Sequence, residues 1–351
     1  MLYNYNIKWS CSSVVEHYVD IVGVVGSIPI VTTIYSINIC MKIFLATISC
    51  CILVFTAISF NTSKLPDHSI FFNKNDSLYE TLKKDGSFDN VIIYKIVDNI
   101  SSIKNNIKTG EYILSSNDNT FTFLKKLIEN KSVTRKITFP EGWTVYQIVE
   151  KLNKDTILSG NIKELPKEGS VMPSTYFYRF GNSKIDILNM MKDQMVLVKK
   201  EIEKQNKTKL STNEVIVLAS IIEKEVHKDN DRKLVSSVYH NRLNKKMKLQ
   251  SDPTVIYSLT KNNVYKGQRS KTKITHKDLL ADSPYNTYKN TGLPPTPICC
   301  PSKASIEAAM NPAKTKYLFF ISDIKNDKVY YSEDFKQHVE YKKMLKKNKC
   351  L

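Results

Sequence analysis

Two glutamates that follow an apolar run are the residues of this chain best suited to acid–base chemistry. The uncharged run Val215–Ile222 is followed directly by Glu223, Lys224 and Glu225. If the run is helical, the neighbours of Glu223 are mainly apolar, namely Ile216, Ala219, Ser220 and Val226. Burial among apolar side chains raises the pKa of a carboxyl group, which lets a glutamate keep its proton and donate it as a general acid.

Two alternatives to this interpretation stay open. Glu223 could simply begin the solvated end of a buried helix. Glu225 shares a helical face with Leu218, Ile221 and Ile222, so periodicity does not separate the two carboxylates.

Other familiar chemistries lack their motifs in this sequence. There is no HExxH, no G-x-S-x-G and no glycine-rich phosphate loop, and the six histidines are dispersed. The seven cysteines have no metal-ligand spacing. Three of them, Cys299, Cys300 and Cys350, lie beyond the apolar N-terminal region; we expect free thiols there, with a bridge to Cys350 as the alternative. A carboxylate is the favoured catalyst, and no metal or cofactor is implied.

The segment Ser283–Pro295 combines aromatic rings, amides and rigid proline and glycine positions. Sugars are bound by stacking on aromatic faces and by hydrogen bonds from amide side chains, so Tyr285, Asn286 and Tyr288 suit a glycan groove. Taken alone, the segment is more typical of a structural strap, that is, of a loop that packs across the fold, than of a glycan-binding groove.

Helices are predicted to position these residues. Ser211 to Glu214 has the spacing of a capping box, and Asp252-Pro253 suits a helix N-cap followed by proline. Apolar periodicity predicts another helix near 234–243, strands at 317–321 and 329–331, and a lysine-rich final helix.

The part before this region reads as a small mixed unit. Strands are expected at Val91–Val97, Gly110–Leu114 and Val133–Phe139, and a helix at Thr122–Glu129. The turn Pro140–Gly142 should lead into a helix that contains Val145, Ile148, Val149 and Leu152.

An uncharged stretch, Ile43–Phe60, is just long enough to cross a bilayer. We predict a retained signal anchor; a cleaved signal peptide is the alternative. Because a second apolar run, Ile21–Met41, is separated from it by Lys42 alone, we expect translation to begin at Met41 and residues 1–40 to be a non-native extension.

The net charge of +18, from 52 Lys+Arg against 34 Asp+Glu, is compatible with an anionic polymer, an anionic membrane face or nucleic acid. No nucleic-acid recognition motif accompanies it, so nucleic acid is not an expected partner.

Eight segments follow one another in a characteristic order: IKTGEYIL (107–114), FPEGWT (139–144), EGSVMPSTYFY (168–178), LASIIEKEV (218–226), VYHNRL (238–243), LQSDPTVIYSL (249–259), SPYNTYKNTGLPPTPI (283–298) and NPAKTKYLFFISD (311–323). Together, in this order, they resemble the endolytic murein transglycosylase (YceG-like) family. Two positions depart from the family pattern: Ser174 stands where Asp is usual, and Ser251 where Thr is usual.

The resemblance implies an α+β protein held in the inner membrane by a single pass, with its catalytic part in the periplasm. The expected parts are a transmembrane signal anchor at 41–61, a LysM-like α/β module at 62–140, a connecting helical region at 141–210, and a mainly helical catalytic domain with a β-hairpin at 211–348. It selects Glu223 as the catalytic residue, and the substrate-binding residues are expected to be Gln250, Asp252, Tyr285, Asn286, Thr287 and Tyr288.

The implied activity is that of a lyase without a cofactor. It cleaves the bond between N-acetylmuramic acid and N-acetylglucosamine in peptidoglycan, leaves 1,6-anhydro ends and terminates nascent strands near the synthases. The alternatives are a non-catalytic peptidoglycan-binding scaffold and a hydrolase that gives reducing ends.

Overall fold

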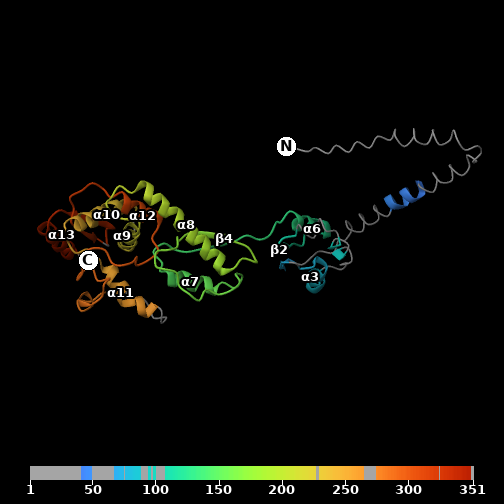
Figure 1. Cartoon of the computed structure of the whole chain (residues 1–351), viewed down its shortest axis with the longest axis horizontal. Coiled ribbons are helices and arrows are strands. Elements are labelled where there is room, and N and C mark those ends of the chain that lie inside the picture. The colour runs from blue at the N-terminus through green and yellow to red at the C-terminus, as the bar shows by residue number, and fades with distance from the viewer. Residues whose placement is uncertain are drawn as a thin grey trace, which may run out of the picture. The chain divides into compact units, whose positions relative to one another are not determined.

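The computed structural model describes residues 41–49, 67–74, 76–87, 94–95, 98–99, 107–226, 229–264, 274–323 and 325–348. The chain divides into two compact units (Figure 1). Described residues within 41–68, 78–104 and 114–129 belong to the first unit, and those within 69–77, 105–113 and 130–348 to the second. Helices and strands occur together, which confirms the α+β class.

The first unit contains helices α3 (Leu78–Asp85) and α6 (Thr120–Ile128), which confirms the helix expected at Thr122–Glu129. Each helix has a polar cap. The Asp98 carboxylate accepts hydrogen bonds from the first two amides of α3, and Asn119 forms a capping box at α6. The strand expected at Val91–Val97 is wrong at Tyr94 and Lys95, which are helical; its other residues lie outside the described part.

A two-stranded sheet pairs β1 (His68–Phe72) with β2 (Gly110–Leu114), where a strand was expected. Glu111 is buried on β2, and its carboxylate accepts two hydrogen bonds from the Arg135 guanidinium at 2.8 and 2.9 Å. The pairing satisfies a charge that would be costly to bury alone. A LysM-like character for this region stays a prediction.

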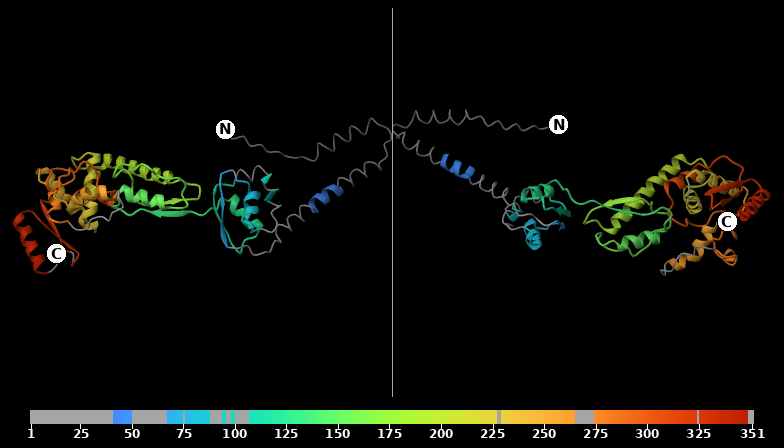
Figure 2. Two further views of the ribbon diagram at one scale, coloured as in Figure 1. Left: turned by 90° about the horizontal axis from the view of Figure 1, so that it is seen from below. Right: turned by 180° about the vertical axis from the view of Figure 1, so that it is seen from behind.

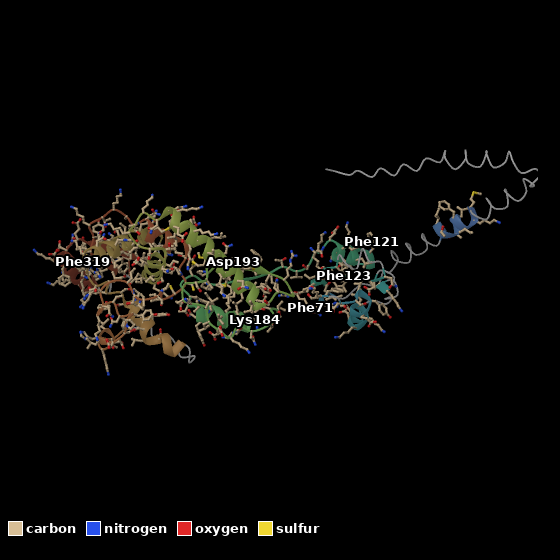
Figure 3. All side chains as sticks on the ribbon, in the orientation of Figure 1. Phe71, Phe121, Phe123, Lys184, Asp193 and Phe319 are labelled. Atoms are coloured by element: carbon tan, nitrogen blue, oxygen red, sulfur yellow. The ribbon has the colours of Figure 1, made fainter. Side chains whose placement is uncertain are left out.

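Residues 130–205 of the second unit contain a pair of strands and two helices. Strand β3 (Arg135–Thr138) runs antiparallel to β4 (Thr175–Tyr178), and the helices are α7 (Val145–Lys154) and α8 (Lys184–Gln205). The four apolar residues expected in one helix do lie on α7, and all four are buried. Lys184, labelled in Figure 3, is also buried, and its ammonium donates to Asn153 O and Asn161 Oδ1.

The rest of the unit confirms most of the predicted elements. Its helices and strands are α9 (Thr212–Glu225), α10 (Asp229–Asn244), α11 (Asp252–Val264), a 3₁₀ turn η1 (Asp278–Leu280), α12 (Lys303–Met310), β5 (Phe319–Asp323), β6 (Lys328–Ser332) and α13 (Phe335–Lys347). One detail differs, because Asp252 is the first residue of α11 rather than its N-cap. Within residues 130–348, Figure 1 shows α7 and β4 toward one end and α13 at the other, and Figure 2 shows the same chain from two other directions.

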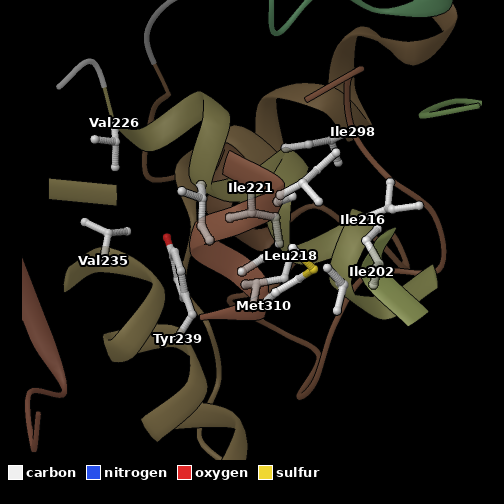
Figure 4. Close-up of a cluster of buried hydrophobic side chains, with 14 of the residues drawn as sticks. Ile202, Ile216, Leu218, Ile221, Val226, Val235, Tyr239, Ile298 and Met310 are labelled. Atoms are coloured by element: carbon white, nitrogen blue, oxygen red, sulfur yellow. The ribbon is translucent and has the colours of Figure 1, made fainter. Parts of the chain in front are cut away.

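Helix α9 is the centre of the larger core. Ser211 forms the predicted capping box with Glu214, and all eight residues Val215–Ile222 are buried. A helix that is apolar on every side must be covered on every side, and α8, α10, α11 and α12 pack around this one. Figure 4 shows the cluster, with the Tyr239 hydroxyl directed toward the side on which Val226 lies.

Within the described residues, no helix combines the length and apolar character that a membrane crossing requires. Residues 41–49 are helical. The remainder of the predicted anchor, and the predicted extension at 1–40, lie outside the described residues.

Candidate active site

The two glutamates at the end of α9 face different surroundings. A helix turns about 100° per residue, so side chains two positions apart point in nearly opposite directions. Glu223 reaches α12 and α10, whereas Glu225 reaches a different part of α10 and the segment that leads into α11.

Glu223 is bound by polar and charged groups. Its Oε2 accepts hydrogen bonds from the Ser302 amide at 3.0 Å and the Ser302 hydroxyl at 2.5 Å, and its Oε1 lies 3.8 Å from the Arg232 guanidinium. Ser302 is the N-cap of α12, where a negative charge is favoured by the helix dipole. The expectation of apolar surroundings for Glu223 is therefore wrong; helical periodicity counted only its neighbours on α9, whereas its partners come from other segments.

Glu225 is held by hydroxyl groups instead. Its Oε1 accepts hydrogen bonds from Ser251 Oγ at 2.6 Å and from Tyr239 Oη at 3.0 Å. Among the residues that the structure describes, Oε2 has no hydrogen-bond partner. The side chain is only partly buried, and it lines a cavity of about 350 Å³ between the end of α9, α10 and the β5–β6 hairpin.

The surroundings of Glu225 favour its neutral form. Burial raises the pKa of the Glu225 carboxyl, and the negative charge of Asp252 raises it further. The hydrogen bonds from Ser251 and Tyr239, and the Arg242 guanidinium, act in the opposite direction. The result is a carboxyl group with a raised pKa that still has donors to stabilise its anion.

The backbone of Ser251 is held by two threonine hydroxyls. The Ser251 amide donates to Thr287 Oγ1 at 2.9 Å, and the Ser251 carbonyl accepts from Thr254 Oγ1 at 2.7 Å. The preceding residue, Gln250, has a left-handed backbone with φ of 50°, which is uncommon for a residue other than glycine. Its amide donates to Thr287 O at 3.1 Å, and its side chain is exposed.

The predicted substrate-binding residues fall into two groups. Gln250, Asp252 and Tyr288 are accessible beside Ser251, and the Tyr288 hydroxyl donates to Asp252 Oδ1 at 2.5 Å. Asn286 and Thr287 are buried; Asn286 donates to two backbone carbonyls, and Thr287 holds Ser251. Because these two side chains are buried, they are better suited to holding the conformation of the segment Ser283–Pro295 than to direct contact with a ligand.

Tyr285, the sixth predicted residue, belongs to another cavity. It is largely buried, its hydroxyl is 2.7 Å from Thr296 Oγ1, and its ring packs against Tyr257. With Glu168 and other residues it lines a cavity of about 560 Å³ on the N-terminal part of α9.

Glu168 was not selected from the sequence, although it is the first residue of one family-like segment. Burial raises the pKa of Glu168 to about 7, while hydrogen bonds from the Val145 amide, the Cys300 thiol and the Tyr257 hydroxyl lower it. Cys299 and Cys300 are buried free thiols, as expected; Cys350 lies outside the described residues. Tyr239 was also missed, because only the fold brings it to Glu225.

Comparison with known proteins gives the family. The model of the YceG-like family matches residues 73–344. The endolytic murein transglycosylase of Bacillus subtilis (strain 168) is 36% identical over 209 residues, which cover 55% of this chain and 56% of that protein. The endolytic murein transglycosylase of Streptococcus pneumoniae (strain R6) is 30% identical over 305 residues, which cover 74% of this chain and 54% of that protein.

The chain therefore spans about half the length of the curated relatives it matches. The crystal structure of a yceG-like protein from Listeria monocytogenes is 33% identical, with a TM-score of 0.48, and the match covers 79% of this chain and 99% of that one. The family match extends over most of this chain and includes the segments around both glutamates. The chain belongs to the YceG-like family.

Proposed function

We propose that this chain is an endolytic murein transglycosylase in which Glu225, rather than Glu223, is the catalytic acid and base. The names of the curated relatives support the activity. The observation that carries the choice of residue is the position of Glu225 in a cavity, with one oxygen bound by two hydroxyl groups and the other without a described partner.

In the first step, neutral Glu225 donates its proton from Oε2 to the oxygen that joins C1 of N-acetylmuramic acid to C4 of N-acetylglucosamine. That glycosidic bond then breaks, and the N-acetylglucosamine leaves with a free 4-hydroxyl. As the carboxyl becomes an anion, the hydrogen bonds from Ser251 and Tyr239 to Oε1 stabilise the developing charge.

In the second step, the carboxylate removes the proton from the muramyl 6-hydroxyl while that oxygen bonds to C1. The products are a 1,6-anhydromuramyl end and Glu225 in its original protonated state. Because the nucleophile belongs to the same sugar, its effective concentration is high and no second carboxylate is required.

The accessible residues beside Glu225 would bind the sugars. Tyr288 offers a partly exposed ring for stacking, and Gln250 and Asp252 offer hydrogen-bonding groups. Glu223 would have an architectural role, joining the end of α9 to the N-terminus of α12.

The direct test is incubation of the full chain with purified sacculi, followed by mass spectrometry of the released muropeptides. We expect anhydro ends, each lighter by one water than the reducing ends that a hydrolase would give. Reducing ends, or binding to sacculi without cleavage, would refute the proposal and favour the hydrolase or the scaffold.

We also propose that the uncharged segment 43–60 anchors the protein in the cytoplasmic membrane and that the chain after about residue 61 faces the periplasm, close to the peptidoglycan synthases. The support is the absence of charge in that segment and the location of murein outside the cytoplasm. A reporter enzyme that works only in the cytoplasm should be inactive when fused after Leu351, and an active fusion would contradict this topology.

A further inference from the structure

The cavity of about 560 Å³ beside Glu168 has no role in the acid–base mechanism. Its volume is in the range of small-molecule sites. The walls are largely apolar and include Leu165, Tyr257, Pro295 and Pro297. Apolar walls of this kind can pack against the aliphatic groups of a ligand, including the side chains and extended backbone of a short peptide.

Charge at this cavity favours an anion. Lys167 and Lys199 line it, and neither ammonium has an ion-pair partner among the described residues. The one carboxyl group in the lining is Glu168, and burial raises the pKa of that group to about 7, so close to neutrality much of it carries no charge. The two lysine charges are therefore not cancelled within the cavity.

The cavity and the proposed catalytic residue are built on the same elements. Val217 lines the cavity and Glu225 ends the same helix, so they are separated by roughly 12 Å along α9. Tyr257 lines the cavity from α11, whose first residue is Asp252. Four extended peptide residues span about 13 Å, enough to connect the two sites.

We propose that this cavity binds the acidic stem peptide carried by a muramyl residue of the bound strand, with Lys167 and Lys199 pairing with the peptide carboxylates. The proposal rests on the proposed function for the identity of the strand. It makes the peptide a determinant of substrate affinity, with no part in bond cleavage.

Binding is tested first, because it does not depend on activity. The full chain is titrated calorimetrically with N-acetylmuramyl pentapeptide at low salt. Lys167→Gln with Lys199→Gln should weaken binding by about tenfold, the sum of two exposed ionic contacts. The matched control, Lys163→Gln with Lys200→Gln, changes two exposed lysines that do not line the cavity and should bind like the parent.

A peptide with its carboxyl groups amidated should bind the parent as weakly as the acidic peptide binds the cavity double variant. The inference is overturned if the parent does not bind the acidic peptide, if amidation makes no difference, or if both double variants bind equally well.

Cleavage then separates this inference from the proposed function. On peptide-bearing strands the cavity double variant should raise KM about tenfold at an unchanged kcat, because two exposed ion pairs are lost. On strands stripped of peptide by an amidase, parent and variant should have the same KM. Equal KM of the parent on both substrates would overturn the inference, whereas a parent that binds the peptide but cleaves neither substrate would refute only the proposed function.

Discussion

Replacement of Glu225 by glutamine distinguishes the two carboxylates at the end of α9. Glutamine keeps the shape of the side chain and an oxygen that can accept from Ser251 and Tyr239. It removes the transferable proton and the base. Release of anhydromuropeptides should therefore fall by about 10²- to 10⁴-fold, the usual cost of losing general acid–base catalysis.

The stability of Glu225→Gln should be close to that of the parent. Burial raises the pKa of Glu225, so an ionised carboxylate at this position is disfavoured, and a neutral amide avoids that cost. We expect the free energy of unfolding to be equal or slightly higher at neutral pH, as measured by urea denaturation.

Glu223→Gln is the matched control and should behave in the opposite way. The amide can accept from Ser302, but it loses the charge that strengthens both hydrogen bonds and pairs with Arg232. A loss of about 1–3 kcal/mol in unfolding free energy is expected, with activity per folded molecule within roughly one order of magnitude of the parent. The assignment is wrong if folded Glu225→Gln keeps near-parental activity, or if Glu223→Gln is equally stable but inactive.

Three further changes test other parts of the structure. Ser251→Ala removes a hydrogen-bond donor to the Glu225 carboxylate, so the pKa of Glu225 should rise, the basic limb of the pH–rate profile should move to higher pH, and kcat should fall about tenfold. The control Ser251→Thr should behave like the parent, and an unchanged profile in Ser251→Ala would contradict the proposed role of Ser251 in stabilising the anion. Because burial raises the pKa of Glu168 to about 7, the folded protein keeps this proton at pH values where the unfolded chain has lost it, and the parent should lose up to about 3 kcal/mol of stability between pH 4.5 and 7. In urea denaturation, Glu168→Gln should not show this loss of stability between pH 4.5 and 7. If the unfolding free energies of parent and variant depend on pH in the same way, the raised pKa of Glu168 is refuted. Gly169 has a φ of +70°, and in Gly169→Ala the added methyl group would lie 2.6 Å from a proline ring, so the free energy of unfolding should fall by about 1–3 kcal/mol. Gly160→Ala, with a φ of +76° but open space around the new methyl group, should lose less stability, and equal melting temperatures of the two variants would contradict the packing argument.

The helices of the second unit were predictable because their signals are local. The Ser211 capping box and the apolar run after it need only a few neighbouring residues, and α9 begins and ends where those signals indicate. The β5–β6 hairpin and the lysine-rich α13 follow from equally local patterns. The run at Val91–Val97 failed at Tyr94 and Lys95, because a short apolar run can be a buried helical segment as easily as a strand.

The surroundings of the two glutamates were not predictable, because their partners are distant in sequence. Ser302 is 79 residues from Glu223, and Ser251 is 26 residues from Glu225. Helical periodicity states which neighbours on α9 share a face with a glutamate, but not what lies opposite that face. The burial of Asn286 and Thr287 was not predictable for the same reason. The sequence around an Asn or Thr in a loop does not show whether its side chain binds a ligand or, as Asn286 does, a backbone carbonyl.

The different partners of the two carboxylates give each a task that the other could not perform. Glu223 is paired with a guanidinium and the N-terminus of a helix, and both stabilise an anion, so this side chain is suited to a fixed contact. Glu225 is bound by two hydroxyl groups, and these can donate hydrogen bonds to Oε1 both when the carboxyl group is ionised and when it carries a proton on Oε2. A group that must exchange a proton within each catalytic cycle needs the second environment. Because Glu223 anchors the end of α9 to α12, it also helps to fix the backbone from which Glu225 extends.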